Sequence, residues 1–124
     1  MQYAILCYHS EDVVCSWTKE EDDAVMAKLA PIQGKWAKAG KLGPVARLMP
    51  TTTASTVRKG AKPLVLDGPF AETKEQMLGF YLFDFDTLEE VISAARELVH
   101  EPGCMEIRPV QVFFEGALKA AAAK

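Results

Sequence analysis

MLGFYLFDF, residues 77–85, is the stretch that decides the fold class, because it places apolar side chains on both faces of one predicted strand. Successive side chains of an extended chain point to opposite faces, so Tyr81 and Phe83 face one way while Phe80 faces the other. A two-layer domain covers only one face of its sheet with helices, so the second face needs another cover, most simply a second subunit. We therefore predict a homodimer.

Two helices are predicted, one before and one after this strand. Thr18-Lys19-Glu20-Glu21 and Thr87-Leu88-Glu89-Glu90 both have the spacing of a capping box, which marks the start of a helix. Apolar residues then recur at intervals of three and four, in the first helix as far as Gly40. Pro31 lies inside that first pattern and lacks an amide donor, so we expect it to kink the helix or divide it near Ala30.

The remaining apolar segments are predicted to be strands, with the weakest signals between residues 42 and 62. They are residues 3–8, 62–66 and 105–114, with a weaker strand signal at 45–48, and residues 56–58 can be extended. The order strand, helix, two or three strands, helix, strand is that of the split βαβ, ferredoxin-like fold. We expect an α+β domain in which an antiparallel sheet carries two helices on one face. Two such sheets packed face to face would form a dimeric α+β barrel.

A long loop, residues 67–76, leads into the central strand. Asp67-Gly68-Pro69 favours a sharp turn, because aspartate bonds nearby backbone, glycine accepts positive φ and proline fixes φ. The loop is longer than an ordinary hairpin connection, and this excess length indicates a function. Phe70 is its apolar anchor, and its charged side chains are Asp67, Glu72, Lys74 and Glu75.

Length and composition bound the class of protein. A chain of 124 residues suits one domain, which we place at residues 1–114, followed by an Ala-rich tail at 115–124. The net charge of −3 and the absence of a basic run argue against binding to nucleic acid or an anionic membrane. Three widely spaced cysteines indicate reduced thiols, and the N-terminus lacks an export signal, so we expect a cytoplasmic protein.

Two residues are candidates for acid–base catalysis. Asp67 would act as a general base if desolvation raised its pKa, but an aspartate before Gly-Pro also serves simply to form the turn. His9 follows the first predicted strand and would serve as an acid or base, although a solvated histidine there needs no special role. His100 is interpreted as a cation at a helix C-terminus.

A second group of residues would bind a ligand. Arg58, Lys74 and Arg108 suit a carboxylate, enolate or phosphate, yet Arg108 would equally pair with Glu106 or with acidic residues of the loop. An aromatic ligand would contact Tyr81 and nearby phenylalanines, which are equally suited to a core. The full set of predicted binding residues is Arg58, Phe70, Glu72, Lys74, Glu75, Tyr81 and Arg108.

No phosphate-binding loop, dinucleotide fingerprint, nucleophile elbow or zinc-ligand spacing is present, so no cofactor and no metal are expected. Two functional hypotheses follow. The first is a small dimeric accessory or small-molecule-binding protein. The second is a cofactor-independent lyase or isomerase that uses Asp67, with His9, on an activated small molecule.

The run DGPFAETKE at residues 67–75, with Thr56-Val57-Arg58 before it and Glu106-Ile107-Arg108-Pro109-Val110 near the end, resembles the YCII-related family, in its DGPF branch. The resemblance extends from about residue 2 to Phe113. It implies a ferredoxin-like subunit in a dimeric α+β barrel. Some relatives look like enzymes that pair a histidine with an aspartate, and one acts as a dehydrochlorinase on a hydroxylated aromatic ring. The first predicted helix here, residues 20–40, contains no histidine. DGPF-branch genes also accompany genes for sigma factors, which implies a regulatory association.

Overall fold

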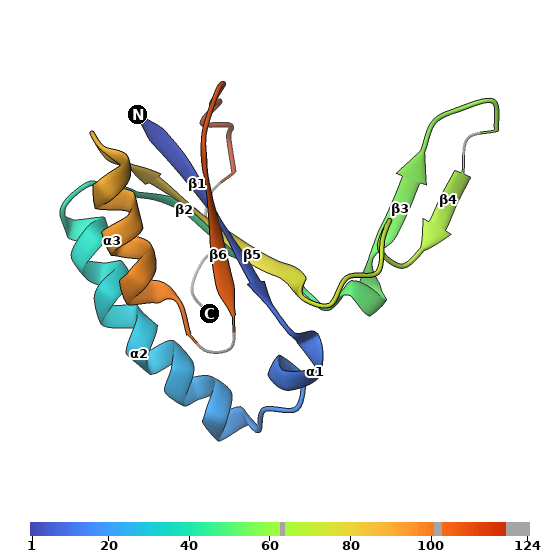
Figure 1. The fold of residues 1–124 in the computed structure, drawn as a ribbon, viewed down its shortest axis with the longest axis horizontal. Coiled ribbons are helices and arrows are strands. Elements are labelled where there is room, and N and C mark those ends of the chain that lie inside the picture. Colours follow the sequence, from blue (N-terminus) through green and yellow to red (C-terminus); the bar gives the residue numbers. More distant parts are fainter. Residues whose placement is uncertain (63, 101–102, 119–124) are drawn as a thin grey trace.

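The body of the protein is a four-stranded antiparallel sheet with two helices on one face (Figure 1). The computed structural model describes residues 1–62, 64–100 and 103–118. The sheet has the order β2-β5-β1-β6, which is the ferredoxin-like order. Its strands are β1 (Gln2–His9), β2 (Leu42–Arg47), β5 (Gln76–Asp84) and β6 (Cys104–Pro109), and the helices are α2 (Lys19–Lys38) and α3 (Leu88–Leu98). The predicted α+β fold class is confirmed.

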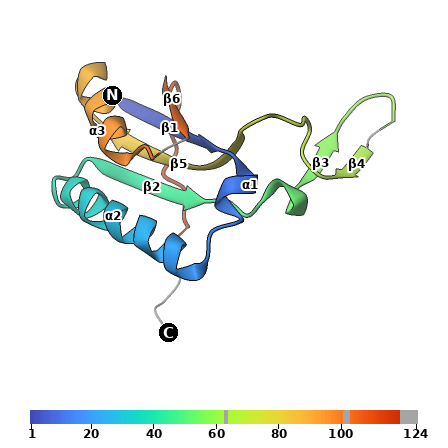
Figure 2. The ribbon, with the colours of Figure 1, turned by 60° about the horizontal axis from the view of Figure 1, so that its bottom comes forward.

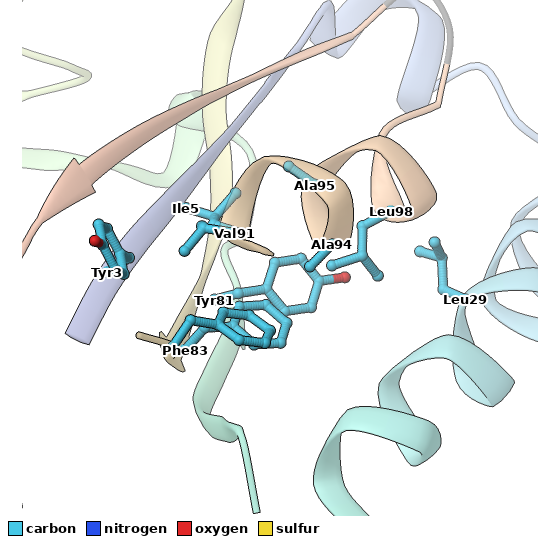
Figure 3. Packing of buried hydrophobic residues seen from close by; sticks show 10 residues of the cluster. Tyr3, Ile5, Leu29, Tyr81, Phe83, Val91, Ala94, Ala95 and Leu98 are labelled. Atoms are coloured by element: carbon cyan, nitrogen blue, oxygen red, sulfur yellow. The ribbon is translucent and has the colours of Figure 1, made fainter. Parts of the chain in front are cut away.

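The core lies between the sheet and the helices, as Figure 3 shows. Register pairs Tyr3 with Phe83 and Ile5 with Tyr81, so these four side chains share the helix-facing side of adjacent strands. The ring of Phe83 stacks on that of Phe85, with 5.3 Å between centroids. This half of the alternation predicted for residues 77–85 is therefore buried by α2 and α3.

Both predicted helix starts are confirmed, and of the two outcomes expected at Pro31, a kink or a division, the division is wrong. The Thr18 side chain accepts a hydrogen bond from the Glu21 amide, and the Glu21 carboxylate accepts one from the Thr18 amide, which completes the capping box. Helix α2 runs unbroken through Pro31. Pro31 and Ala27, the residue whose carbonyl group loses its helical hydrogen bond to the proline, are both exposed, so water has access to this part of the helix. Gly40, at φ +72°, ends the helical segment as expected.

The last strand is shorter than predicted. Strand β6 ends at Pro109 rather than Phe114, and the final bond to its neighbour runs from the Val110 amide to the Gln2 carbonyl. Because β6 runs antiparallel to β1, it reaches the start of β1 there and has no further partner. Of the predicted tail, residues 115–118 are exposed and residues 119–124 lie outside the described residues.

Strands β3 (Ser55–Arg58) and β4 (Leu64–Asp67) form a separate two-stranded sheet, here called the arm. Figures 1 and 2 show the arm projecting from the body, beyond the short helix α1 (Glu11–Val14) and the turn η1 (Thr51–Thr53). Its base is fixed by the Glu11 carboxylate, which accepts bonds from the Thr51 amide at 2.8 Å and the Thr51 hydroxyl at 2.9 Å. The body thus holds the arm at one end only.

Candidate functional site

A cavity of about 290 Å³ lies where β1 ends and β5 begins, between the sheet, α1, α2 and the end of α3. Its lining is mainly apolar, with contributions from Val14, Met26, Leu29 and Leu98. The polar residues that line it are Cys7, Tyr8, His9, Trp17, Gln33, Arg47, Tyr81, His100 and Cys104. A largely apolar cavity with a few convergent polar groups is the usual form of a small-molecule site.

Three rings form one wall of this cavity. The ring centroids of His9 and His100 lie 5.1 Å apart, and that of Trp17 lies 5.8 Å from each. His9 is 4% exposed, so the interpretation of a solvated histidine is wrong. Its ring packs against Gly103, where a Cβ atom would lie 2.8 Å from the imidazole and 2.7 Å from the Tyr8 carbonyl oxygen. Glycine at 103 therefore allows the chain after α3 to approach His9.

The environment of His100 favours the neutral imidazole. Burial is the main cause that lowers its pKa, and the neighbouring His9 and Arg47 lower it further, while the Leu98 carbonyl partly offsets them. A neutral imidazole has one nitrogen that donates and one that accepts a hydrogen bond. His100 is thus able to accept a proton or to bind a polar group of a ligand.

Two further polar groups of the cavity, the thiol of Cys7 and the hydroxyl of Tyr81, keep their protons at neutral pH. Burial raises the pKa of the Cys7 thiol to about 11, so it stays protonated and is a poor nucleophile. Burial likewise raises the pKa of Tyr81, whose hydroxyl accepts a bond from the Gln33 amide at 2.9 Å. Figure 3 shows the Tyr81 hydroxyl directed along the core toward Leu98 and Leu29. The interior suits a neutral, mainly apolar ligand.

Arg47 is the cationic group of the lining, and it is already paired. Its guanidinium donates to both carboxylate oxygens of Asp22, at 2.6 and 3.2 Å. The bond from Arg47 is the main cause that lowers the pKa of Asp22, and the same bond raises the pKa of Arg47. The pair fastens β2 to α2 and leaves little unpaired positive charge for an anionic ligand.

Of the residues predicted from the sequence, His9 and Tyr81 line the cavity and the others lie elsewhere. Asp67 and Arg58 are exposed on the arm. The Asp67 carboxylate makes no hydrogen bond or ion pair within the part of the chain that the structure describes. The turn instead depends on Gly68, whose φ is +97° and whose carbonyl accepts a bond from the Thr56 hydroxyl at 2.8 Å.

The residues of the loop and the last strand are dispersed. Phe70 and Lys74 are exposed, and Glu72 borders a separate hollow that includes Thr51 and Gln76. The Glu75 carboxylate lies 3.7 Å from the Cys104 sulfur. Arg108 is exposed on the sheet face away from the helices and forms no ion pair with any described residue.

The sequence patterns missed four residues of this cavity as site residues. Trp17 and Gln33 carry no motif, Arg47 lay in a weak segment, and His100 was interpreted only through the helix dipole. The available signal was a pair of histidines, each at the end of a predicted element. Only the pairing of β1 with β6 shows that these two ends meet.

Two features are absent from the part of the chain that the structure describes. No group of three or more His, Cys, Asp or Glu residues suited to a metal ion occurs in residues 1–62, 64–100 and 103–118. Among those same residues, no helix combines the length and the apolar character needed to cross a membrane. The described chemistry is that of the cavity.

The protein is thus a ferredoxin-like α+β chain with a mainly apolar cavity beside its sheet. The family model of the YCII-related domain matches residues 1–114. The chain is also 52% identical over 122 residues to an uncharacterized protein of Rhizobium meliloti (strain 1021), an alignment that covers 95% of this chain and 98% of that protein. The chain belongs to the YCII-related family.

Proposed function

We propose that this chain is a small-molecule-binding protein whose ligand occupies the cavity beside His9 and His100. The observation that carries the proposal is the mainly apolar lining, in which a few hydrogen-bonding groups converge and Arg47 is paired with Asp22. A planar aromatic molecule with one hydroxyl group fits this chemistry, since its ring would pack against Trp17 and its hydroxyl would bond an imidazole. The sequence already indicated an aromatic ligand near Tyr81.

Binding is tested by the fluorescence of Trp17 during titration with phenol, in a Trp36→Phe background that leaves Trp17 as the chain's one tryptophan. We expect a saturable change. Val45→Phe, which fills the cavity from the edge strand β2, should abolish it. Leu88→Phe is the matched control, because Leu88 and Val45 are both 45% exposed and Leu88 does not line the cavity. Equal signals from these two variants would contradict the proposal.

A homodimer is part of this proposal. On the sheet face away from the helices, Ala4 pairs with Leu82 and Leu6 with Phe80, which places an apolar strip across two strands. Two such faces packed together would remove both strips from water. Phe114, exposed in the segment after β6, adds further apolar surface to the chain. Sedimentation velocity should give twice the chain mass, and a monomer at micromolar concentration would exclude the dimer.

A cofactor-independent lyase or isomerase is the second candidate, and the His9–His100 pair favours it. A neutral imidazole facing a bound enolisable compound would remove a proton from carbon and return one, so that the compound exchanges hydrogen with solvent. Asp67, the acid–base candidate of the sequence, lies on the arm and outside the lining. The proposal therefore assigns the base to His100 or His9 and keeps Asp67 as the alternative.

The two bases are separated by deuterium exchange into acetylacetone, followed by proton magnetic resonance. If a cavity histidine is the base, His9→Gln or His100→Gln should slow exchange by about a hundredfold, and Asp67→Asn should leave it unchanged. The reverse result would assign the role to Asp67. Exchange no faster than in buffer would leave binding as the function.

We further propose that the chain belongs to the DGPF branch of the family, on the run at residues 67–75. The three free cysteines support a cytoplasmic location. The association with sigma factors is proposed on the same resemblance, as the regulatory setting in which a bound ligand would act.

A further inference from the structure

We propose that the arm docks on a second copy of this chain, at the acidic corner formed by α1 and the first turn of α2. This inference rests on the proposed homodimer and goes beyond it, since it names an exchanged element and the surface that receives it. The acidic corner comprises Glu11, Asp12, Glu20, Glu21, Asp22 and Asp23. The two copies would each give an arm and receive one.

The first observation is that the arm exposes apolar side chains on both of its faces. Val57 pairs directly with Val65 on one face, and these side chains are 73% and 71% exposed. Leu64 and Leu66 are exposed on the opposite face. A two-stranded sheet is marginal in water unless its apolar face packs on something. The arm therefore needs a partner surface that its own body does not supply.

The second observation is charge complementarity. Arg58, Lys59 and Lys62 lie at the outer end of the arm, are exposed, and form no ion pair with described residues. Residues 11–23 carry six acidic side chains and one basic one. Asp12 and Glu20 are both exposed and have no ion-pair partner in the described part of the chain. Attraction between the two regions would give the docking its orientation.

The third observation is that the two regions of one chain lie apart. Figures 1 and 2 show the arm leading outward from its base, away from α1. If two copies exchange arms about a two-fold axis, the arm and the acidic corner of each copy are both in contact with the partner, because the axis repeats each contact. A different protein as partner would contact only one of these two regions. The geometry therefore favours a second copy as the occupant.

The docked arm would complete the site. Val14 and Trp17, on and just after α1, line the cavity, so an arm held at the acidic corner borders the cavity of the partner. The basic residues of the arm also place positive potential beside the opening. The ligand site of one copy is then walled in part by the other.

The test measures the dimer dissociation constant by sedimentation at low salt. Lys59→Glu with Lys62→Glu should weaken the dimer by about tenfold, and Asp12→Lys with Glu20→Lys should do the same. Combining the four changes should restore affinity to within about threefold of the original, because the reversed charges attract again. Lys28→Glu with Lys38→Glu is the matched control, an equal charge change on exposed α2 residues outside the contact. Circular dichroism checks that every variant is folded.

Carbodiimide coupling gives an independent readout, since it joins a lysine directly to a nearby carboxylate. In a mixture of isotope-labelled and unlabelled chains, we expect mixed-label peptides that join Lys59 or Lys62 to Asp12 or Glu20. A dimer dissociation constant that does not change when the arm charges are reversed would overturn the arm contact but not the homodimer. Cross-links found only within one chain would do the same. A monomeric chain would overturn both, and ligand binding in the cavity is scored separately by Trp17 fluorescence.

Discussion

The body and the arm contain the same kinds of residue in very different surroundings. Phe83 in β5 is 1% exposed, whereas Val57 and Val65 of the arm are 73% and 71% exposed. Both regions are antiparallel strands with alternating apolar side chains, yet the helices α2 and α3 cover those of the body alone. The comparison teaches that strand patterning by itself does not bury a side chain, and that the cover decides which strands are stable alone.

The largest expected contrast is between Phe83→Ala and Phe70→Ala. Phe83 packs against Tyr81, Phe85 and Trp36, so its truncation should lower the free energy of unfolding by about 3–5 kcal/mol. Phe70→Ala should change it by less than about 0.5 kcal/mol, because Phe70, in the loop that follows the arm, is 77% exposed. Urea denaturation followed by circular dichroism measures both. Equal losses would mean that Phe70 is packed in solution.

Two glycines, one in the body and one in the arm, should show a smaller contrast in stability. A Cβ atom at Gly79 would lie 2.5 Å from the Ala46 carbonyl oxygen, so Gly79→Ala should push β2 from β5 and cost about 1–3 kcal/mol. Gly60, between the strands of the arm, has no atom within 4 Å of such a Cβ. Gly60→Ala should therefore be near neutral in thermal melts. A loss of stability in Gly60→Ala with none in Gly79→Ala would contradict the close packing of β2 on β5.

A smaller effect, which arises from His100 in the body, is expected in the pH dependence of the free energy of unfolding. Because the pKa of His100 is lowered in the folded chain, the unfolded chain takes up the proton first as pH falls through the ordinary value of 6.5. The contribution of neutral His100 to the free energy of unfolding is thus fully present above that pH and is lost as pH falls toward the lowered pKa. Unfolding free energies measured from pH 7 to 5 should fall less steeply in His100→Gln. An identical slope would show that His100 is not the group responsible.

The smallest expected effect is that of an exposed ion pair. The Lys35 ammonium lies 2.7 Å from the Glu97 carboxylate and joins α2 to α3, but both side chains remain accessible to solvent. A double-mutant cycle with Lys35→Ala and Glu97→Ala should give a coupling of about 0.2–1 kcal/mol that decreases with salt. A coupling above this range would mean that the body depends on its surface charges as well as on its core.

Local patterns were enough for most of the fold. Thr18 and Thr87 marked the helix starts, and the double alternation at residues 77–85 marked the central strand. Two details differ from expectation: α2 is not divided at Pro31, which lies on an exposed part of the helix, and β6 stops where β1 begins. The sequence could not place the arm outside the main sheet, since its strands carry ordinary strand patterns.

The candidate site was less predictable. His9 and Tyr81 were named from the sequence, while Trp17, Gln33, Arg47 and His100 were identified by the cavity they line. Two of the ligand residues proposed from the sequence, Arg58 and Arg108, lie on separate surfaces.

The fold class and the family follow from local properties of the chain, namely side-chain periodicity, helix caps and the run at residues 67–75. Only the tertiary structure decided that His9 meets His100 and that the arm stands apart from the body. The physical reason is that burial and proximity depend on strand register and on which surface covers which, and these are set by contacts between residues far apart in sequence.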